Sequence, residues 1–168
     1  MISNSSKQRK QQTVKTNISM DGIGLHSGKK VTVIIEPAKT DNGIKFIRTD
    51  KSKNNIINAL WSNVSSTNLC TTISNSKGVS VSTVEHLMSA LSGMHIDNAN
   101  ILIDNLEVPI MDGSSLPFVE NLEKCGVISQ ENDRKIILVK KEIAVFKDDK
   151  FAKILPNNQF SIDFEIDF

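Results

Sequence analysis

The segment STVEHLMSAL, residues 82–91, places a glutamate beside a histidine near the start of an expected helix. The N-terminal end of a helix carries partial positive charge, which favours carboxylate and disfavours imidazolium. Glu85 is therefore expected to be ionised and His86 to be neutral. A general base and a metal ligand require these two forms, so a metal site with an adjacent base is one interpretation of the pair.

Helix capping is the alternative interpretation of Glu85. Ser82 stands three residues before it, which is the spacing of a capping box, in which the glutamate carboxylate accepts a hydrogen bond from the backbone N–H of the cap. Capping alone accounts for the glutamate, and His86 is then a surface histidine.

Helical periodicity separates His86 from the apolar face. At about 100° per residue, one stripe contains the apolar side chains of Val84, Leu87, Met88 and Leu91. His86 points almost oppositely, and Ser89 and Ala90 are expected beside it. Small side chains there let a ligand or another layer approach closely, whereas a solvent-facing helix usually carries Lys or Glu.

The residues alone do not assemble a complete zinc site. The H-E-x-x-H motif is absent, because Ala90 stands four residues after His86. A catalytic zinc needs three protein ligands and an open position, and only His26 and His95 remain as histidines. His95 follows an expected helix stop at Gly93 and is predicted to be a loop histidine that interacts with the last helix carbonyls.

Two further polar segments have simple turn interpretations. GIGLHSGKK, residues 22–30, resembles a phosphate loop but precedes a strand instead of a helix, so a tight turn between strands is predicted, with His26 lining a site as the alternative. VPIMDGSS, residues 108–115, places Asp112 before a helix, where it is expected to cap or order the turn.

Strand and helix patterns alternate along the first part of the chain. Strand patterns occur at residues 31–37, 43–50, 55–59, 70–74 and 100–104. The first two are expected to be neighbouring strands joined by a turn. One helix is predicted at 82–91, closed by Gly93, and a second follows a serine cap, with Pro117 in its first turn and Gly126 as its stop.

The pattern changes near residue 130. A polar stretch at 128–134 is predicted to be a linker, and strand-like segments follow at 135–141, 142–146, 151–156 and 160–168, with a turn at 147–150. The last of them alternates strictly and leaves an apolar face that something should cover. It is either a strand covered by the first domain or the start of a second domain that has been cut short.

Composition limits the classes of function. The chain has 168 residues and a formal charge of +1, from 20 basic and 19 acidic side chains, and it contains no tyrosine. Such a chain lacks the basic patch and exposed aromatic pattern of a nucleic-acid-binding domain, so no nucleic-acid partner is expected. Cys70 and Cys125 are far apart, which favours a reducing, cytoplasmic compartment, and no transmembrane segment is predicted.

Five segments, taken in order, resemble a known enzyme family. They are GIGLHSGKKV, TNLCTT, STVEHLMSALSG, IDNANILIDNLEVPIMDGSSLPFV and FSIDFEIDF. In this order they are similar to the N-terminal half of UDP-3-O-acyl-N-acetylglucosamine deacetylase, the zinc amidase of the committed step of lipid A biosynthesis in Gram-negative bacteria. The resemblance runs from about Thr13 to Phe168.

The resemblance implies an α+β fold. It predicts a two-layer sheet-and-helix sandwich domain, followed by the first strands of a second domain of similar type. We therefore divide the chain into a disordered tail at 1–12, a first domain at 13–131 and a partial second domain at 132–168. In the family, two such domains stack with their helices facing one another, and the active site lies between the layers.

The resemblance also implies roles for individual residues. His86 becomes one Zn²⁺ ligand, and Glu85 becomes the general base that takes a proton from zinc-activated water. Positions matching the contacts of an amphiphilic UDP-sugar substrate are Leu25, His26, Leu69, Cys70, Lys150 and Phe168. A lysine can meet the diphosphate and an aromatic ring can pack on the uracil, although Lys150 is equally consistent with a solvated hairpin charge.

The remaining zinc ligands are expected beyond Phe168, in a C-terminal half that would be the intramolecular partner. One ligand does not hold a catalytic zinc, so this polypeptide alone is predicted to be inactive or nearly so. The alternative is a non-catalytic structural or interaction module, or a degenerate copy of the deacetylase domain.

Overall fold

The computed structural model describes residues 10–166. The chain divides between Arg134 and Lys135 into two compact units, close to the boundary expected after residue 131. Within the described residues, no helix is long and apolar enough to cross a membrane. Phe168 and most of the expected tail at 1–12 lie outside the described residues.

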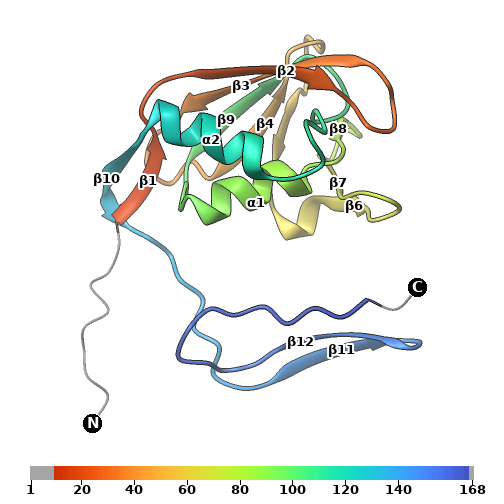
Figure 1. Cartoon of the computed structure of the whole chain (residues 1–168), viewed down its shortest axis with the longest axis vertical. Coiled ribbons are helices and arrows are strands. Elements are labelled where there is room, and N and C mark those ends of the chain that lie inside the picture. Colours follow the sequence, from red (N-terminus) through yellow and green to blue (C-terminus); the bar gives the residue numbers. More distant parts are fainter. Residues whose placement is uncertain (1–9, 167–168) are drawn as a thin grey trace. The chain divides into compact units, whose positions relative to one another are not determined.

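A five-stranded sheet forms the main layer of the first unit (Figure 1). In spatial order its strands are β2 (Ile18–Ile23), β3 (Lys30–Pro37), β9 (Ala99–Ile103), β4 (Ile44–Arg48) and β5 (Ile56–Asn58). The β4–β9 pair is parallel and the other pairs are antiparallel.

Both helices cover the same face of this sheet (Figure 1). Alternate residues of the central strands are buried, as the two-residue period of a strand requires; in β9 they are Ala99, Ile101 and Ile103. From the other layer, α1 (Glu85–Gly93) and α2 (Leu116–Cys125) bury Leu87, Ala90, Leu91, Phe118 and Leu122. The result is a two-layer α+β domain, which confirms the predicted fold class.

The predicted adjacency of the first two strands is wrong. The segment between Pro37 and Ile44 does make a turn, but β9 lies between β3 and β4. Val33 of β3 pairs with Ile103, and Phe46 of β4 pairs with Ile101. A strand that is paired on both edges satisfies all its backbone groups in the sheet, so the apolar β9 takes the centre.

Helix α1 is shifted relative to its prediction. It begins at Glu85 instead of Ser82 and runs through Gly93, and the left-handed residue beyond it is His95, with φ of 58°. Ala90 is only 1% exposed, so it belongs to the core face and not to the His86 side. The 3.6-residue period placed Leu87 and Leu91 correctly on the core face, but it placed Ala90 beside His86, outside that face.

Helix α2 follows its prediction closely. Pro117 stands in the first turn, and Gly126 ends the helix with φ of 80°, a conformation that suits glycine. The serine cap is present in a modified form. The hydroxyl group of Ser114 accepts a hydrogen bond from the Leu116 N–H at 3.1 Å, while Ser115 at the cap position makes no side-chain cap bond.

Residues 128–134 do not form the predicted linker. Residues 128–133 belong to β10 (Val127–Asp133), which pairs antiparallel with β1 (Lys10–Val14), so residues 10–12 are also a strand and not a tail. Buried amides hold this pair to the domain. Asn98, which is almost inaccessible, donates to the Gln11 Oε1 at 2.8 Å and to the Gln130 Oε1 at 2.7 Å.

A small three-stranded sheet contains β6 (Val64–Ser66), β7 (Thr72–Ser74) and β8 (Ser80–Val81), and it follows the 3₁₀ turn η1 (Trp61–Asn63). Strand β8 leads directly into the residues before α1. This sheet therefore connects the segment around Cys70 with the start of that helix.

The second unit contains one hairpin. Its strands β11 (Ile143–Lys147) and β12 (Lys150–Ile154) pair antiparallel around the predicted turn. The strands predicted at 135–141 and 160–168 are wrong for the described residues, which form no strand at 135–141 or 160–166. A strand needs a hydrogen-bonded neighbour, and these two segments have none within residues 10–166.

Truncating the helix core should destabilise the first unit strongly. Phe118→Ala removes a fully buried ring and should lower the free energy of unfolding by about 3–5 kcal/mol. Leu116→Ala is the control, because Leu116 is 57% exposed on the same helix and should change stability by no more than about 0.5 kcal/mol. Urea unfolding followed by circular dichroism measures both, and equal losses would contradict the assigned core.

Candidate functional site

Glu85 is anchored to the small sheet and not to its own helix cap. It is the first residue of α1 and half-buried, and its Oε2 accepts a hydrogen bond from the Thr71 N–H at 3.0 Å. The predicted capping box is absent, because the backbone N–H of Ser82 donates to the Leu106 carbonyl instead. The carboxylate is therefore positioned by a segment distant in sequence.

The bond to Thr71 brings two predicted substrate residues toward Glu85. Leu69 and Cys70 immediately precede Thr71 in the chain. The Leu69 side chain is 84% exposed, while Cys70 is half-buried with its Sγ 3.7 Å from the Thr72 hydroxyl oxygen. This loop presents an apolar side chain to solvent beside the candidate base.

His86 lies outside the core, as the helical periodicity predicts, and is near Asp112 in the turn before α2. Hydrogen bonds from the Ser114 hydroxyl and amide groups lower the pKa of Asp112, and the charge of His86 adds to this effect. Asp112 orders its turn, accepting the Ser114 N–H at 2.9 Å. The segments VEHL and MDGS, which are separated in sequence, thus come together electrostatically.

The segment Gly24–Gly28 is the predicted tight turn between β2 and β3. The Gly24 N–H donates to the Lys29 carbonyl, and the Gly28 N–H donates to the Gly24 carbonyl, each at 2.9 Å. Leu25 and His26 are exposed at its tip. The backbone N–H groups of His26 and Ser27 donate to the two carboxylate oxygens of Glu107, each at 2.9 Å.

Glu107 is a site residue that the sequence did not reveal. Its side chain is buried, with the residue 2% exposed, and it also accepts the Thr83 hydroxyl at 3.0 Å. Burial raises the pKa of this carboxyl group, but the hydrogen bonds from His26, Ser27 and Thr83 outweigh it, so the pKa lies below its usual value of 4.5. The only signal in the sequence is an acidic residue enclosed by apolar ones in LEVPI.

Gly24 is required by the close approach of Glu107. A Cβ atom at Gly24 would lie 2.5 Å from the Glu107 Oε2 and 2.9 Å from its Cδ. Real Cβ contacts are longer, and both atoms belong to a buried, hydrogen-bonded group that cannot move aside freely. The glycine therefore allows the turn to wrap tightly around the carboxylate.

Three of the seven non-glycine residues with positive φ in the described part of the chain stand near the candidate site. Leu69, Thr83 and Met111 all have positive φ, at 61°, 55° and 56°. Left-handed conformations cost free energy for such side chains, and most of all for a β-branched threonine. Each of the three stands shortly before a site residue, namely Cys70, Glu85 or Asp112, and strain of this kind tends to persist at functional sites.

The structure does not test the substrate contacts predicted for Lys150 and Phe168, which stay predictions. Lys150 is exposed in the second unit, where it pairs with Lys147 across the hairpin turn, and Phe168 lies outside the described residues. His95 lies beyond the opposite end of α1, and its backbone N–H donates to the Ser92 carbonyl at 3.1 Å, as predicted for a loop histidine.

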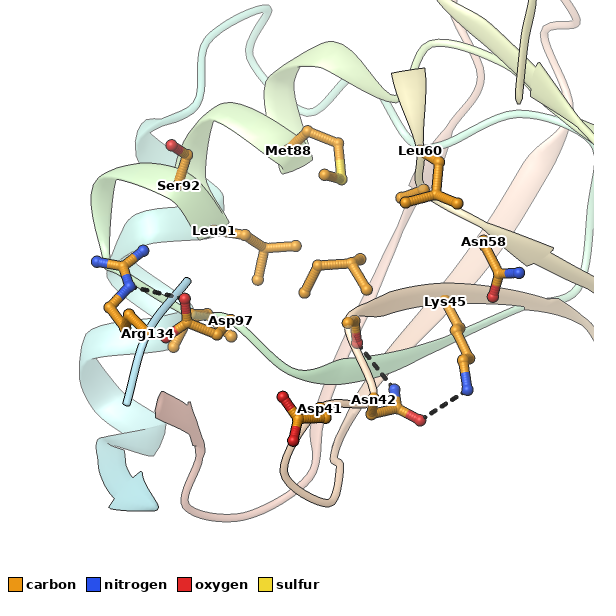
Figure 2. A pocket seen from close by; sticks show the side chains of 14 residues that line it. Asp41, Asn42, Lys45, Asn58, Leu60, Met88, Leu91, Ser92, Asp97 and Arg134 are labelled. Carbon is orange, nitrogen blue, oxygen red and sulfur yellow. Dashed lines mark hydrogen bonds and ion pairs between the residues drawn. The ribbon is translucent and has the colours of Figure 1, made fainter. Parts of the chain in front are cut away.

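A pocket of about 660 Å³ lies elsewhere in the first unit (Figure 2). Met88 and Leu91 of α1 line it together with Leu60, and an ion pair of 2.7 Å between Arg134 and Asp97 stands at one side. None of the sequence-predicted site residues lines this pocket.

A family model described as UDP-3-O-acyl N-acetylglycosamine deacetylase matches residues 11–168. The chain belongs to this family. The match confirms the resemblance found in the sequence motifs, and it covers both structural units.

Curated relatives agree with the family match. A protein of Syntrophus aciditrophicus named UDP-3-O-acyl-N-acetylglucosamine deacetylase is 46% identical over 158 residues, which are 94% of this chain and 50% of the relative. Relatives of the same name are 48% identical in Shewanella pealeana, over 94% of this chain and 52% of the relative, and 44% identical in Wigglesworthia glossinidia brevipalpis, over 95% and 54%. The chain spans about half the length of the curated relatives it matches.

Among the described residues, His86 fits one ligand position of the zinc site that the family resemblance implies. His86 is half-buried in the first turn of α1 and lies outside the core. No group of three His, Cys, Asp or Glu side chains within residues 10–166 is arranged to hold a metal ion. These residues fit a single imidazole ligand with an adjacent carboxylate, and not a complete coordination sphere.

The depressed pKa of Glu107 predicts a pH dependence of stability. Its ionised form stabilises the fold above about pH 4.5, and this contribution is lost as the pH falls from that value through the folded-state pKa. Glu107→Gln should cost about 1.5–3 kcal/mol at neutral pH, and the difference from the unmodified chain should shrink below pH 4.5. Urea unfolding at several pH values measures this.

Glu123→Gln provides the control for this prediction, since Glu123 is exposed on α2. Its unfolding curve should follow that of the unmodified chain at every pH. A constant difference between Glu107→Gln and the unmodified chain from neutral to acidic pH would show that ionisation of Glu107 contributes nothing.

Proposed function

We propose that this chain supplies the general base and one zinc ligand of a deacetylase that removes the N-acetyl group from UDP-3-O-acyl-N-acetylglucosamine, in lipid A biosynthesis. Family membership and the names of the relatives support this reaction. The observation that carries the assignment is the position of Glu85, a half-buried side chain that a distant backbone N–H holds next to His86 at the start of α1.

Glu85 is suited to accept a proton. Within the described residues, its hydrogen bond to Thr71 engages Oε2, and Oε1 remains to receive the proton of the attacking water. The Thr71 N–H fixes the direction of the carboxylate, which a general base requires. The Glu85 side chain is half-buried.

His86 is the residue of this chain that would hold Zn²⁺, with the other ligands supplied by the C-terminal half. Bound zinc would polarise the acetamide carbonyl and bring the pKa of its water to about 7. Asp112 lies within electrostatic range of His86.

Two loops flank the base and are proposed to contact the substrate. Leu25 and Leu69 are exposed on the loops that carry His26 and Cys70, and such apolar side chains suit an amphiphilic UDP-sugar. Lys150 and Phe168 are proposed to meet its nucleotide part, by charge and by stacking. A cytoplasmic location is proposed as well, on the evidence of the two free thiols.

Replacing the base should abolish turnover. The test uses a chimera in which residues 11–168 of this chain replace the matching region of the Shewanella pealeana relative. Deacetylation of UDP-3-O-acyl-N-acetylglucosamine by this chimera is measured. Glu85→Gln keeps an oxygen that can accept the Thr71 N–H but removes the proton acceptor, so kcat should fall at least about 100-fold while zinc content and stability are retained.

Glu123→Gln, on the exposed face of α2, is the matched control and should leave kcat unchanged. Glu85→Gln retaining kcat within about threefold would show that Glu85 only holds the Thr71 loop. A chimera that folds and binds zinc but deacetylates nothing would contradict the proposed reaction.

The 168-residue chain alone should not bind zinc tightly. One imidazole provides too few ligands, so isothermal titration with Zn²⁺ should show no tight site and the chain should be inactive or nearly so. The chimera is the positive control in the same titration. One tight site on the chain alone would contradict the assignment of the other ligands to the C-terminal half.

A further inference from the structure

We propose that Glu107 is a positioning residue that couples the substrate loop at 24–28 to the start of helix α1. In this role, one buried carboxylate fixes the position of the loop relative to the start of the helix. The inference rests on the proposed function only in treating Glu85 and His86 as the chemical groups. The coupling itself follows from the contacts of Glu107.

The carboxylate joins two segments that make no other side-chain hydrogen bond to each other within residues 10–166. Its Oε1 accepts both the His26 N–H at 2.9 Å and the Thr83 hydroxyl at 3.0 Å, and its Oε2 accepts the Ser27 N–H at 2.9 Å. His26 stands on the substrate loop, and Thr83 stands two residues before Glu85. If the donors on one segment move, the carboxylate moves with them, and its hydrogen bonds to the other segment change.

The backbone of Glu107 is also fixed to the residues before α1. Ser82 and Glu107 form a parallel bridge, in which the Ser82 N–H donates to the Leu106 carbonyl at 2.9 Å and the Val108 N–H donates to the Ser82 carbonyl at 3.1 Å. The carboxylate is thus presented from a backbone that is itself tied to the start of the helix. The loop is closed by its own backbone bonds between β2 and β3, and the Glu107 carboxylate links it to the residues before α1.

Thr83 shows that this arrangement does more than fill space. Its φ of 55° is unfavourable for a β-branched residue, so the chain needs an interaction that holds it there. The hydroxyl bond to Glu107 is such an interaction, and it orients the backbone that enters α1. If Thr83 adopted a more common backbone conformation, the chain would enter α1 in a different direction, and Glu85 and His86 would change position.

A glutamate is the residue that can do this. An ionised carboxylate has only acceptors and can accept several hydrogen bonds at once, and the donors here are two backbone N–H groups and one hydroxyl. Glutamine would turn N–H donors toward one of these groups. An apolar residue would leave two backbone N–H groups of the loop without their acceptor.

The experiment is site-resolved amide hydrogen exchange by NMR on the 168-residue chain. Thr83→Val removes the hydroxyl and keeps the shape, and Thr83→Ser keeps the hydroxyl. With Thr83→Val, exchange at the His26 and Ser27 amides should accelerate about tenfold or more relative to core amides of β9 such as Ile101. Thr83→Ser should restore slow exchange in the loop.

Thr32→Val is the matched control, because the Thr32 hydroxyl also donates to a carboxylate, that of Asp21, at 2.7 Å. It should leave the His26 and Ser27 amides unchanged. Loop exchange within about twofold of the unmodified chain in Thr83→Val would overturn the coupling. An equal acceleration at Ile101 would also overturn it, since that pattern indicates a general loss of stability.

Glu107→Gln provides a second readout in the same experiment. It should accelerate exchange at Ser27 in the loop and also at Thr71, whose N–H reports on the position of Glu85. Acceleration at Ser27 alone would show that the helix start does not depend on Glu107. An inactive chimera would count against the proposed function and would leave these exchange results standing.

Discussion

The buried carboxylate of Glu107 is the contact on which the candidate site depends. Burying an ionised group costs solvation free energy, which directed hydrogen bonds must offset. Here the donors are the loop at 24–28 and Thr83, so satisfying the charge also fixes the shape of the site. The requirement extends outward, because Gly24 must lack a Cβ for the loop to approach, and Thr83 must keep an unfavourable backbone conformation.

Local patterns in the sequence predicted the elements of the first unit better than their arrangement. Helix α2 could be placed because Pro117 and Gly126 act on their own backbone, which is a local effect. The position of β9 between β3 and β4 depends on pairing across distant segments, and no local pattern contains it. Strand β10 was missed because its polar side chains are held by amide hydrogen bonds to Asn98 and the Ala38 carbonyl and do not alternate with apolar ones.

The candidate site could be predicted only in part, for a related reason. The pair Glu85 and His86 is visible because the two residues are adjacent in one helix. The partner of Glu85 was predicted wrongly, since Ser82 has the right spacing for a cap but its backbone is engaged with Leu106. Glu107 reads in the sequence as an ordinary acidic residue, and only the fold shows that two loops converge on it.

The left-handed residues near the candidate site are held by the protein's own contacts. Thr83 and Met111 carry left-handed backbone conformations next to a sheet whose inward side chains are buried, and such conformations persist only where the surroundings determine them. The surroundings here are the Ser82–Glu107 bridge and the ordered Asp112 turn. A rigid scaffold of this kind suits the roles proposed for Glu85 and His86, because a reaction that depends on the direction of one proton transfer needs fixed geometry.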